Sequence, residues 1–202
     1  MARLRIGVLI SGSGTNLQAI FDACAEGRID GQVAVVISSH ESAYGLERAR
    51  KAHVPAVFVD RTKYDTLKSY NHAIRIALEE NDANLVAMAG YMRLLGKEVL
   101  VAFPGKVLNI HPALLPSFPG ASGIRDAYDY GVKVTGVTVH FADEQFDRGP
   151  IIAQEAVVIA EDDTIETLEA KIHEVEHRLY PQVLQWIAEE RVVVHGRKAR
   201  VL

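Results

Sequence analysis

Residues 106–120 read K-V-L-N-I-H-P-A-L-L-P-S-F-P-G, and the rest of the chain is interpreted outward from them. The apolar run 107–110 predicts a buried strand, which Pro112 ends because proline cannot donate to a sheet ladder. Side chains alternate along a strand, so Asn109 and His111 share one face. An amide and an imidazole therefore stand at a strand's carboxyl end, where open parallel α/β sheets place ligands. The structural alternative is a turn cap and a loop hydrogen bond.

The composition is that of an ordinary globular chain. Its 202 residues suit one domain, with 49% hydrophobic and 24% charged residues. A net charge of −4 gives no reason to expect a nucleic-acid groove. Cys24 has no cysteine partner, and Ser11 and Gly12 interrupt the first apolar run too early for a membrane span. We expect a cytoplasmic protein with no nucleic-acid or membrane partner, and leave open whether it is a monomer or a homodimer.

The first turn has the pattern of a phosphate site. A strand at 6–10 is followed by S-G-S-G-T-N and a helix, which brings free backbone N–H groups to a positive helix end. The spacing is neither G-x-G-x-x-G nor a Lys-containing P-loop, so a turn without a ligand is the alternative. No acidic residue closes the next strand at 33–39, which favours a monophosphate over a dinucleotide. The expected cradle consists of Ser13, Gly14, Thr15 and Asn16.

Strand and helix patterns then alternate, which predicts an α/β fold with a mostly parallel central sheet and helices on both faces, a three-layer Rossmann-like arrangement. A last long helix should begin at Asp163, with Glu166 as its capping-box partner. The remaining expected elements are helices at 45–52, about 64–80 and 124–130, strands at 56–59, 84–89, 132–141 and 151–159, and a terminal hairpin at 192–202.

Two loops carry further candidate groups. Residues 90–96, G-Y-M-R-L-L-G, follow a strand and could wall a flat heteroaromatic ligand, although Met92 and Leu95 suit a plain core equally well. Residues 142–150 form a polar loop that carries Asp147, and a loop carboxylate is usually solvated.

The stretch H-E-V-E-H at 173–177 fits the zinc-protease motif, with His173 and His177 as ligands and Glu174 as base. The longer signature of that class is missing, and the helix ends a parallel α/β chain. We expect no metal, and assign this face to surface polarity or ligand contact.

Taken together, the chain resembles the phosphoribosylglycinamide formyltransferases, the folate-dependent enzymes of purine synthesis. The matching stretches cover nearly the whole length: I-S-G-S-G-T-N-L-Q-A-I, G-L-E-R-A-R, A-G-Y-M-R-L-L, N-I-H-P-A-L-L-P-S-F-P-G, G-V-T-V-H-F-A-D-E-Q-F-D-R-G-P-I-I-A-Q and H-E-V-E-H-R-L-Y-P. The resemblance implies formyl transfer from 10-formyltetrahydrofolate, as co-substrate, to the amine of glycinamide ribonucleotide, without a metal. It implies one formyltransferase domain, 1–202, with a phosphate-binding half at 1–105 and a catalytic and folate-binding half at 106–202.

The resemblance also assigns site residues. It implies that the nucleotide phosphate lies on Ser13, Gly14, Thr15 and Asn16, helped by His173 and Glu176. It implies a catalytic trio of Asn109, His111 and Asp147. The implied pterin contacts are Met92, Arg93, Leu94, Leu95, Asn109, Asp143, Glu144, Gln145, Phe146 and Asp147.

Two departures limit this transfer. Where the family can carry an arginine that reaches the ligands, this chain has Leu67, so Lys63 or Lys68 would have to substitute. After Gly120, A-S-G-I-R replaces the H-T-H-R segment of some members, so no catalytic role is transferred there.

The chemistry suits the residues independently. The Asn109 amide can donate to a tetrahedral oxyanion, a contact whose loss costs ~10²–10³ in rate. His111 beside Asp147 could act as an imidazolium acid toward the oxyanion or the departing nitrogen. Within the fold, the alternatives are formyltetrahydrofolate hydrolase, which usually has a second histidine where Pro112 stands, and methionyl-tRNA formyltransferase, which has a basic C-terminal domain. From other classes, a nucleotide-binding module and a zinc hydrolase remain.

Overall fold

The structure, a computed structural model, describes residues 4–202. It contains one nine-stranded sheet with the order β3-β2-β1-β4-β5-β6-β7-β9-β8. The first five strands are parallel, and β6 and β7 continue the sheet antiparallel from β5. The strands are β1 (Leu4–Ile10), β2 (Gly31–Ser38), β3 (Ala56–Phe58), β4 (Leu85–Met88), β5 (Val107–His111), β6 (Val134–Phe141), β7 (Ile151–Val158), β8 (Val192–His195) and β9 (Lys198–Val201).

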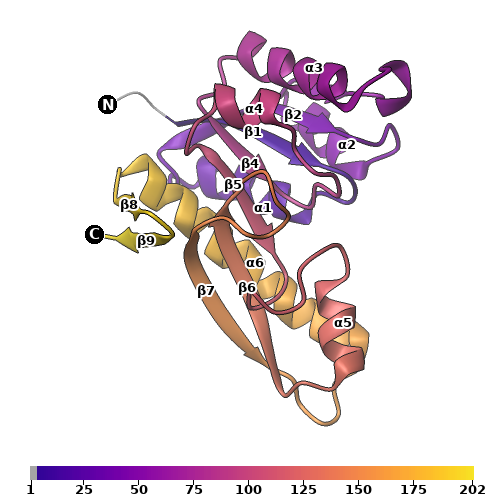
Figure 1. The fold of residues 1–202 in the computed structure, drawn as a ribbon, viewed down its shortest axis with the longest axis vertical. Helices are drawn as coiled ribbons and strands as arrows, with labels where there is room; N and C mark the ends of the chain where they lie inside the picture. Colours follow the sequence, from indigo (N-terminus) through magenta and orange to yellow (C-terminus); the bar gives the residue numbers. More distant parts are fainter. Residues whose placement is uncertain (1–3) are drawn as a thin grey trace.

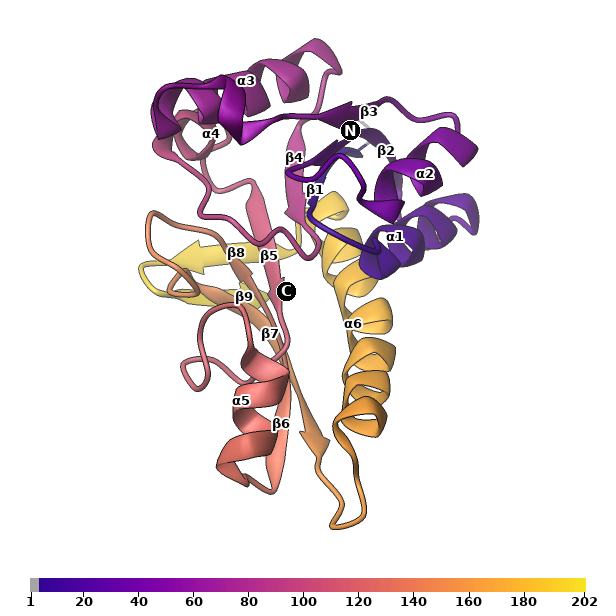
Figure 2. The same cartoon turned by 90° about the vertical axis from the view of Figure 1, so that its right-hand side faces the viewer.

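Helices cover both faces of this sheet, as Figures 1 and 2 show, so the expected three-layer α/β fold is confirmed. One face packs against α1, α2 and α6, and the other packs against α3 and α4. The helices are α1 (Thr15–Ala25), α2 (Tyr44–Lys51), α3 (Leu67–Glu80), α4 (Lys97–Ala102), α5 (Gly123–Tyr130) and α6 (Ile165–Ala188).

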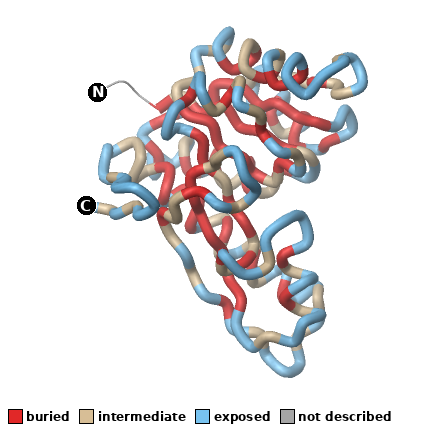
Figure 3. The backbone as a smooth tube through the Cα atoms, in the orientation of Figure 1, coloured by how far each residue is buried: buried red, intermediate tan, exposed pale blue. Residues whose placement is uncertain are grey.

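The parallel strands form the buried centre of the molecule (Figure 3). Their side chains are apolar on both faces, as a sheet covered by helices on each side requires. Tyr180 of α6 ties this centre to the site, because its buried hydroxyl lies 3.1 Å from the carbonyl oxygen of Met88 and 3.2 Å from that of Leu108. The carboxyl ends of β4 and β5 are thereby held side by side.

The strand order reverses between β1 and β4, because the chain first moves outward through β2 and β3 and then returns to the other side of β1. Such a switch point leaves a crevice at the carboxyl ends of the strands, because the connections on its two sides run in opposite directions. The segment 106–120, from which the sequence was interpreted, enters this crevice through β5.

Three expectations about helix ends were wrong. The last helix is capped by Thr164 rather than Asp163, with Thr167 rather than Glu166 completing the capping box, since the two threonines bond each other's backbone N–H groups. Asp163 instead accepts from the N–H of Ala160. The helix expected from about residue 64 begins at Leu67, after a 3-10 turn at Arg61–Lys63, and the short helix α4 was not expected at all.

Candidate functional site

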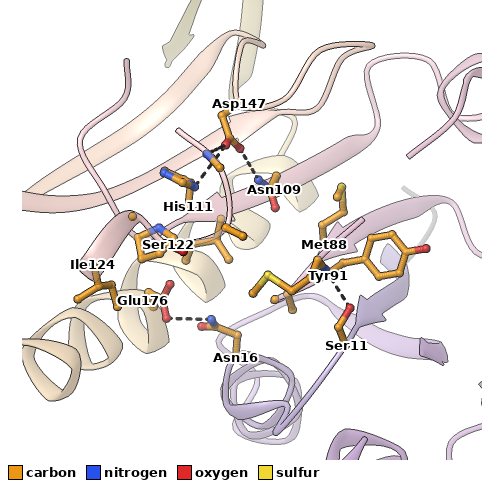
Figure 4. A pocket seen from close by; sticks show the side chains of 18 of the residues that line it. Ser11, Asn16, Met88, Tyr91, Asn109, His111, Ser122, Ile124, Asp147 and Glu176 are labelled. Atoms are coloured by element: carbon orange, nitrogen blue, oxygen red, sulfur yellow. Dashed lines mark hydrogen bonds and ion pairs between the residues drawn. The ribbon is translucent and has the colours of Figure 1, made fainter. Parts of the chain in front are cut away.

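A cleft of about 1520 Å³ opens at the carboxyl ends of β1, β4 and β5. Its walls come from the first glycine turn, the loop after β4, the end of β5 with the loop that follows, the loop between β6 and β7, and α6. Figure 4 shows the side chains that point toward one another across it. The cleft therefore brings together both halves of the chain.

Asp147 meets the β5 residues inside this cleft, although it comes from a distant loop. Its side chain is only 5% exposed, and its two oxygens lie 3.6 Å from His111 Nδ1 and 3.6 Å from His140 Nε2. The carboxylate also accepts hydrogen bonds from Asn109 Nδ2 at 3.3 Å and from the N–H of Gly120 at 2.8 Å (Figure 4). The structure thus gathers Asn109, His111 and Asp147, the three residues to which the family resemblance pointed.

These contacts keep Asp147 ionised. Burial raises the pKa of the Asp147 carboxyl, but contact with His140, the Gly120 N–H and the charge of His111 together outweigh burial and hold that pKa below its ordinary value of 3.8. The residue adopts a left-handed backbone with φ of 54°, a conformation that aspartate tolerates better than most side chains. The loop therefore delivers a fixed negative charge to the end of β5.

The hydrogen-bond partner of His111 Nε2 shows that this nitrogen carries a hydrogen. His111 Nε2 lies 2.8 Å from the carbonyl oxygen of Phe118, and a carbonyl can only accept, so Nε2 carries a hydrogen. The other ring nitrogen faces Asp147. The imidazolium form of His111 thus has an acceptor opposite each nitrogen, and the ring is only 3% exposed.

His140 decides how the Asn109 amide is turned. His140 Nδ1 donates to the carbonyl of Phe141 at 2.8 Å, and its Nε2 lies 3.2 Å from Asn109 Nδ2. The same Asn109 nitrogen donates to Asp147. The nitrogen of the amide is therefore held away from the cleft, and its oxygen is left facing the cleft (Figure 4). The sequence placed His140 on this face without assigning it a role.

The glycine turn presents unpaired backbone donors. Gly14 caps α1 in a left-handed conformation with φ of 70° and no side-chain cap. A helix's first N–H groups have no intrahelical acceptor, and those of residues 13–16 have none among residues 4–202. All four of these residues line the cleft, as expected of an anion cradle.

The opposite wall of this end of the cleft comes from α6. Glu176 is 4% exposed and accepts from Asn16 Nδ2 at 3.0 Å, and the same oxygen lies 2.9 Å from His173 Nδ1. The hydrogen bond and charge of Glu176 raise the pKa of His173 above 6.5, against the opposing effect of burial. The carbonyl oxygen of the buried Asn16 side chain has no partner within residues 4–202. A polar acceptor is thus left for a ligand beside the cradle.

Not all of the predicted folate contacts line the cleft. Met92 and Phe146 do so, and both side chains are largely exposed, whereas Leu95 is 3% exposed in the core. Glu144 pairs instead with Lys97, the first residue of α4, at 2.9 Å. The predicted residues in the cleft lining are Met92, Asn109, Gln145, Phe146 and Asp147, and those outside it are Arg93, Leu94, Leu95, Asp143 and Glu144.

Two further outcomes concern the missing family arginine and a residue that the sequence did not single out. Neither Lys63, Leu67 nor Lys68 lines the cleft, so the structure offers no substitute for the family arginine there. Ser11 was missed by the sequence reasoning: its hydroxyl accepts from the N–H of Met92 at 2.9 Å and bonds Ser39 at 2.7 Å. It thereby joins the glycine turn to the loop after β4.

The H-E-V-E-H stretch does not form a metal cluster. The rings of His173 and His177 are stacked with centroids 6.1 Å apart, and His173 Nδ1 faces Glu176. Within residues 4–202, no three His, Cys, Asp or Glu side chains are grouped so that they could hold a metal ion. In the same range, no helix is both long and apolar enough to cross a membrane.

Comparison with known proteins shows the family of the chain. The family model described as formyl transferase matches residues 4–184, and the chain belongs to this family of formyl transferases. A relative from Bacillus subtilis (strain 168), named phosphoribosylglycinamide formyltransferase, is 42% identical over 90% of this chain and 93% of its own length.

Solved structures agree as well. A glycinamide ribonucleotide transformylase 1 from Symbiobacterium toebii is 52% identical, with a TM-score of 0.97 over 99% of this chain and 94% of that one. A formyltetrahydrofolate deformylase from Pseudomonas syringae is 28% identical, with a TM-score of 0.89 over 100% of this chain and 66% of that one. The fold alone therefore does not separate transfer from hydrolysis.

Proposed function

We propose that Asn109, His111 and Asp147 transfer the formyl group of 10-formyltetrahydrofolate directly to the amine of 5′-phosphoribosylglycinamide. The products are the N-formylglycinamide ribonucleotide and tetrahydrofolate, in purine biosynthesis. The single observation that carries this assignment is that Asn109 and His111 both contact Asp147 in the cleft that also holds the phosphate cradle. No covalent enzyme intermediate is needed, because the phosphate cradle and the three side chains line the same cleft, which can hold two reactants together.

The reaction is balanced by one proton. The amine attacks the formyl carbon, the carbonyl oxygen becomes an oxyanion, and the bond from that carbon to N10 then breaks. The amine loses a proton and N10 gains one. The substrate oxyanion first takes the place of the Phe118 carbonyl as acceptor of the His111 Nε2 hydrogen. His111 then gives this proton to N10 as the bond from the carbon to N10 breaks, and it takes up the proton that the amine loses. Asp147 holds the imidazolium and remains ionised throughout.

Asn109 supplies the second contact to the formyl group. With its nitrogen turned toward Asp147 and His140, the resting amide presents its oxygen to the cleft. A half turn about the terminal bond of the side chain brings Nδ2 to the oxyanion, and the amide oxygen then accepts from His140 when that ring carries a hydrogen on Nε2. Donors aimed at the developing charge in a water-excluded cleft are worth ~10²–10³ in rate each.

The cradle at 13–16, together with His173 and Glu176, is proposed to bind the nucleotide. Phosphate oxygens would meet the free N–H groups of the turn, and the ribose hydroxyls would meet Glu176 and the unpaired oxygen of Asn16. The folate ring is proposed to lie between Met92 and residues 145–147, which line the cleft. The lone Cys24 supports a reducing compartment, and we propose the cytoplasm.

Two substitutions test the catalytic assignment. His111→Ala should lower kcat ~10²–10⁴-fold, while the dissociation constant for glycinamide ribonucleotide, measured by calorimetry, stays within about threefold of wild type. His195→Ala is the control, because that histidine is exposed in the terminal hairpin. A variant at position 111 that turns over as fast as wild type would remove His111 from the mechanism.

The competing function is hydrolysis of formyltetrahydrofolate, since a protein of that activity shares the fold. Incubation of the enzyme with formylfolate alone tests it. Transfer predicts deformylated folate only when glycinamide ribonucleotide is present, whereas hydrolysis releases formate without it.

A further inference from the structure

The motif G-L-E-R-A-R at 45–50 forms most of α2, and the catalytic account gives it no task. The structure places it directly behind the glycine turn. The N–H of Gly45 donates to the carbonyl of Gly12 at 3.1 Å, and Arg48 Nε donates to the carbonyl of Ser13 at 2.9 Å. Residues of α2 thus donate hydrogen bonds to two successive carbonyls of the glycine turn.

These two hydrogen bonds also fix the direction of the N–H groups in the same two peptides. In a trans peptide the C=O and N–H point to opposite sides. The carbonyls of Gly12 and Ser13 point toward α2, so the N–H groups of Ser13 and Gly14, which share those peptides, point away from it, toward the cleft that both residues line. Without the hold on Ser13, its carbonyl could turn into the cleft and meet an anion with the wrong charge.

The fit between helix and turn leaves no room for side chains. A Cβ added at Gly14 would lie 2.8 Å from the Cα of Gly45, and one added at Gly45 would lie 2.3 Å from Ile10 Cδ1. Both contacts are closer than real Cβ atoms approach. The two glycines therefore let the backbone of α2 touch the turn.

Arg48 is itself immobilised for this purpose. Its Nη1 donates to Gln18 Oε1 at 3.0 Å, and its guanidinium lies 4.9 Å from the centroid of the Tyr44 ring. The side chain is half-buried and does not line the cleft. It therefore reaches a bound phosphate through the turn that it holds and through its charge, which Arg48→Lys retains.

We propose that Arg48 is a positioning residue that sets the Ser13 peptide so that the Gly14 N–H meets the phosphate of the nucleotide substrate. This inference rests on the proposed cradle. Loss of the bond should weaken binding of the phosphorylated substrate ~10-fold, the value of one backbone hydrogen bond to a charged group. The chemical step should not change, since no reacting atom is touched.

The experiment compares Arg48→Met and Arg48→Lys with Arg50→Met. Arg50 is a matched control because it lies two residues further on the same helix, is exposed, and pairs with Glu47 of the same helix. The expected result is a ~10-fold rise in KM for glycinamide ribonucleotide in Arg48→Met, with kcat within about twofold, partial recovery in Arg48→Lys, and no change in Arg50→Met.

A second readout separates positioning from general damage. The dephosphorylated substrate, glycinamide riboside, should react with wild type and Arg48→Met at the same kcat/KM, because it brings no phosphate to the turn. An equal loss with both substrates would overturn the inference, and so would an unchanged KM for the ribonucleotide. If Arg48→Met does not fold, Arg48→Lys alone gives the same comparison at smaller amplitude.

Titration with inorganic phosphate tests separately whether residues 13–16 bind phosphate and whether Arg48 positions them. In wild type, the backbone amide resonances of residues 13–16 should shift, and in Arg48→Met the Gly14 shift should require ~10-fold more phosphate. Resonances that do not move in wild type would refute the cradle and the inference together. Resonances that move equally in both proteins would refute only the role of Arg48.

Discussion

Replacing Asp147 by asparagine removes one charge and leaves the size of the side chain unchanged. The carboxylate is met by four groups: the Gly120 N–H at 2.8 Å, Asn109 Nδ2 at 3.3 Å, and the imidazoles of His111 and His140 at 3.6 Å each. An amide can offer one oxygen to these groups, so its NH₂ must face a donor. A buried donor left unpaired costs ~1–3 kcal/mol, which we expect to lose from the free energy of unfolding.

The kinetic cost of Asp147→Asn should be larger. Without the charge, the imidazolium of His111 loses the group that holds it, and general acid catalysis contributes ~10²–10⁴-fold. We expect kcat to fall within that range, measured from the absorbance of deformylated folate, and KM for the ribonucleotide to stay within about threefold. Asp143→Asn is the control, because that carboxylate accepts the Gln145 N–H within its own loop.

The pH dependence of the free energy of unfolding shows how the charge of Asp147 contributes to stability. Because the pKa of Asp147 is lowered in the folded protein, its ionised form contributes stability that is fully present above the unfolded pKa of about 3.9 and is lost as pH falls through the folded pKa. In urea unfolding below about pH 5, the stability difference between wild type and Asp147→Asn should narrow near pH 4 and below, as the Asp147 carboxylate takes up a proton. A kcat within threefold of wild type, or a stability difference that grows as pH falls below about 4, would refute this reasoning.

Three further predictions follow from single contacts. Ser11→Ala removes the acceptor of the Met92 N–H and should raise KM for formylfolate ~5–10-fold, with KM for the ribonucleotide less affected; equal changes in both would contradict the link between turn and loop. Glu176→Gln should lower the pKa of His173 in an NMR titration, and an unchanged pKa would refute the pairing. The pair stabilises the fold fully below about pH 6.5 and less as pH rises through the folded pKa of His173. The pH-dependent part of the stability lost in Glu176→Gln should therefore shrink at high pH. Gly136→Ala places a Cβ 2.1 Å from a carbonyl oxygen of β7 and should lower the free energy of unfolding by at least ~2 kcal/mol in urea titration; a neutral effect would contradict the packing of β6 on β7.

The strand and helix order could be predicted because each element carries its own periodicity. Residues 107–110 are apolar and end at a proline, and the structure has a strand at Val107–His111. Helix ends were harder, because Asp163 and Thr164 are both good caps and only the geometry of the turn selects between them. The six residues of α4 are too short to show a helical period.

The catalytic trio was accessible from the sequence for two different reasons. Asn109 and His111 follow from strand alternation, but Asp147 lies 36 residues beyond His111 in a polar loop, and only the family resemblance singled it out. The roles of Ser11 and His140 depend on partners across the sheet, Met92 and Asn109, which a single sequence does not pair. The alternation of Thr138 and His140 was the available signal for His140.

The central claim is that the cleft transfers a formyl group directly between two bound substrates, with Asn109, His111 and Asp147 around the reacting carbon. The most direct measurement is an NMR single-turnover experiment with ¹³C-formyl-labelled 10-formyltetrahydrofolate and excess glycinamide ribonucleotide. The account predicts that the label appears quantitatively in the N-formylglycinamide product in wild type, and that the rate falls ~10²-fold or more in His111→Ala. Label appearing as free formate, or transfer at the wild-type rate without His111, would contradict it.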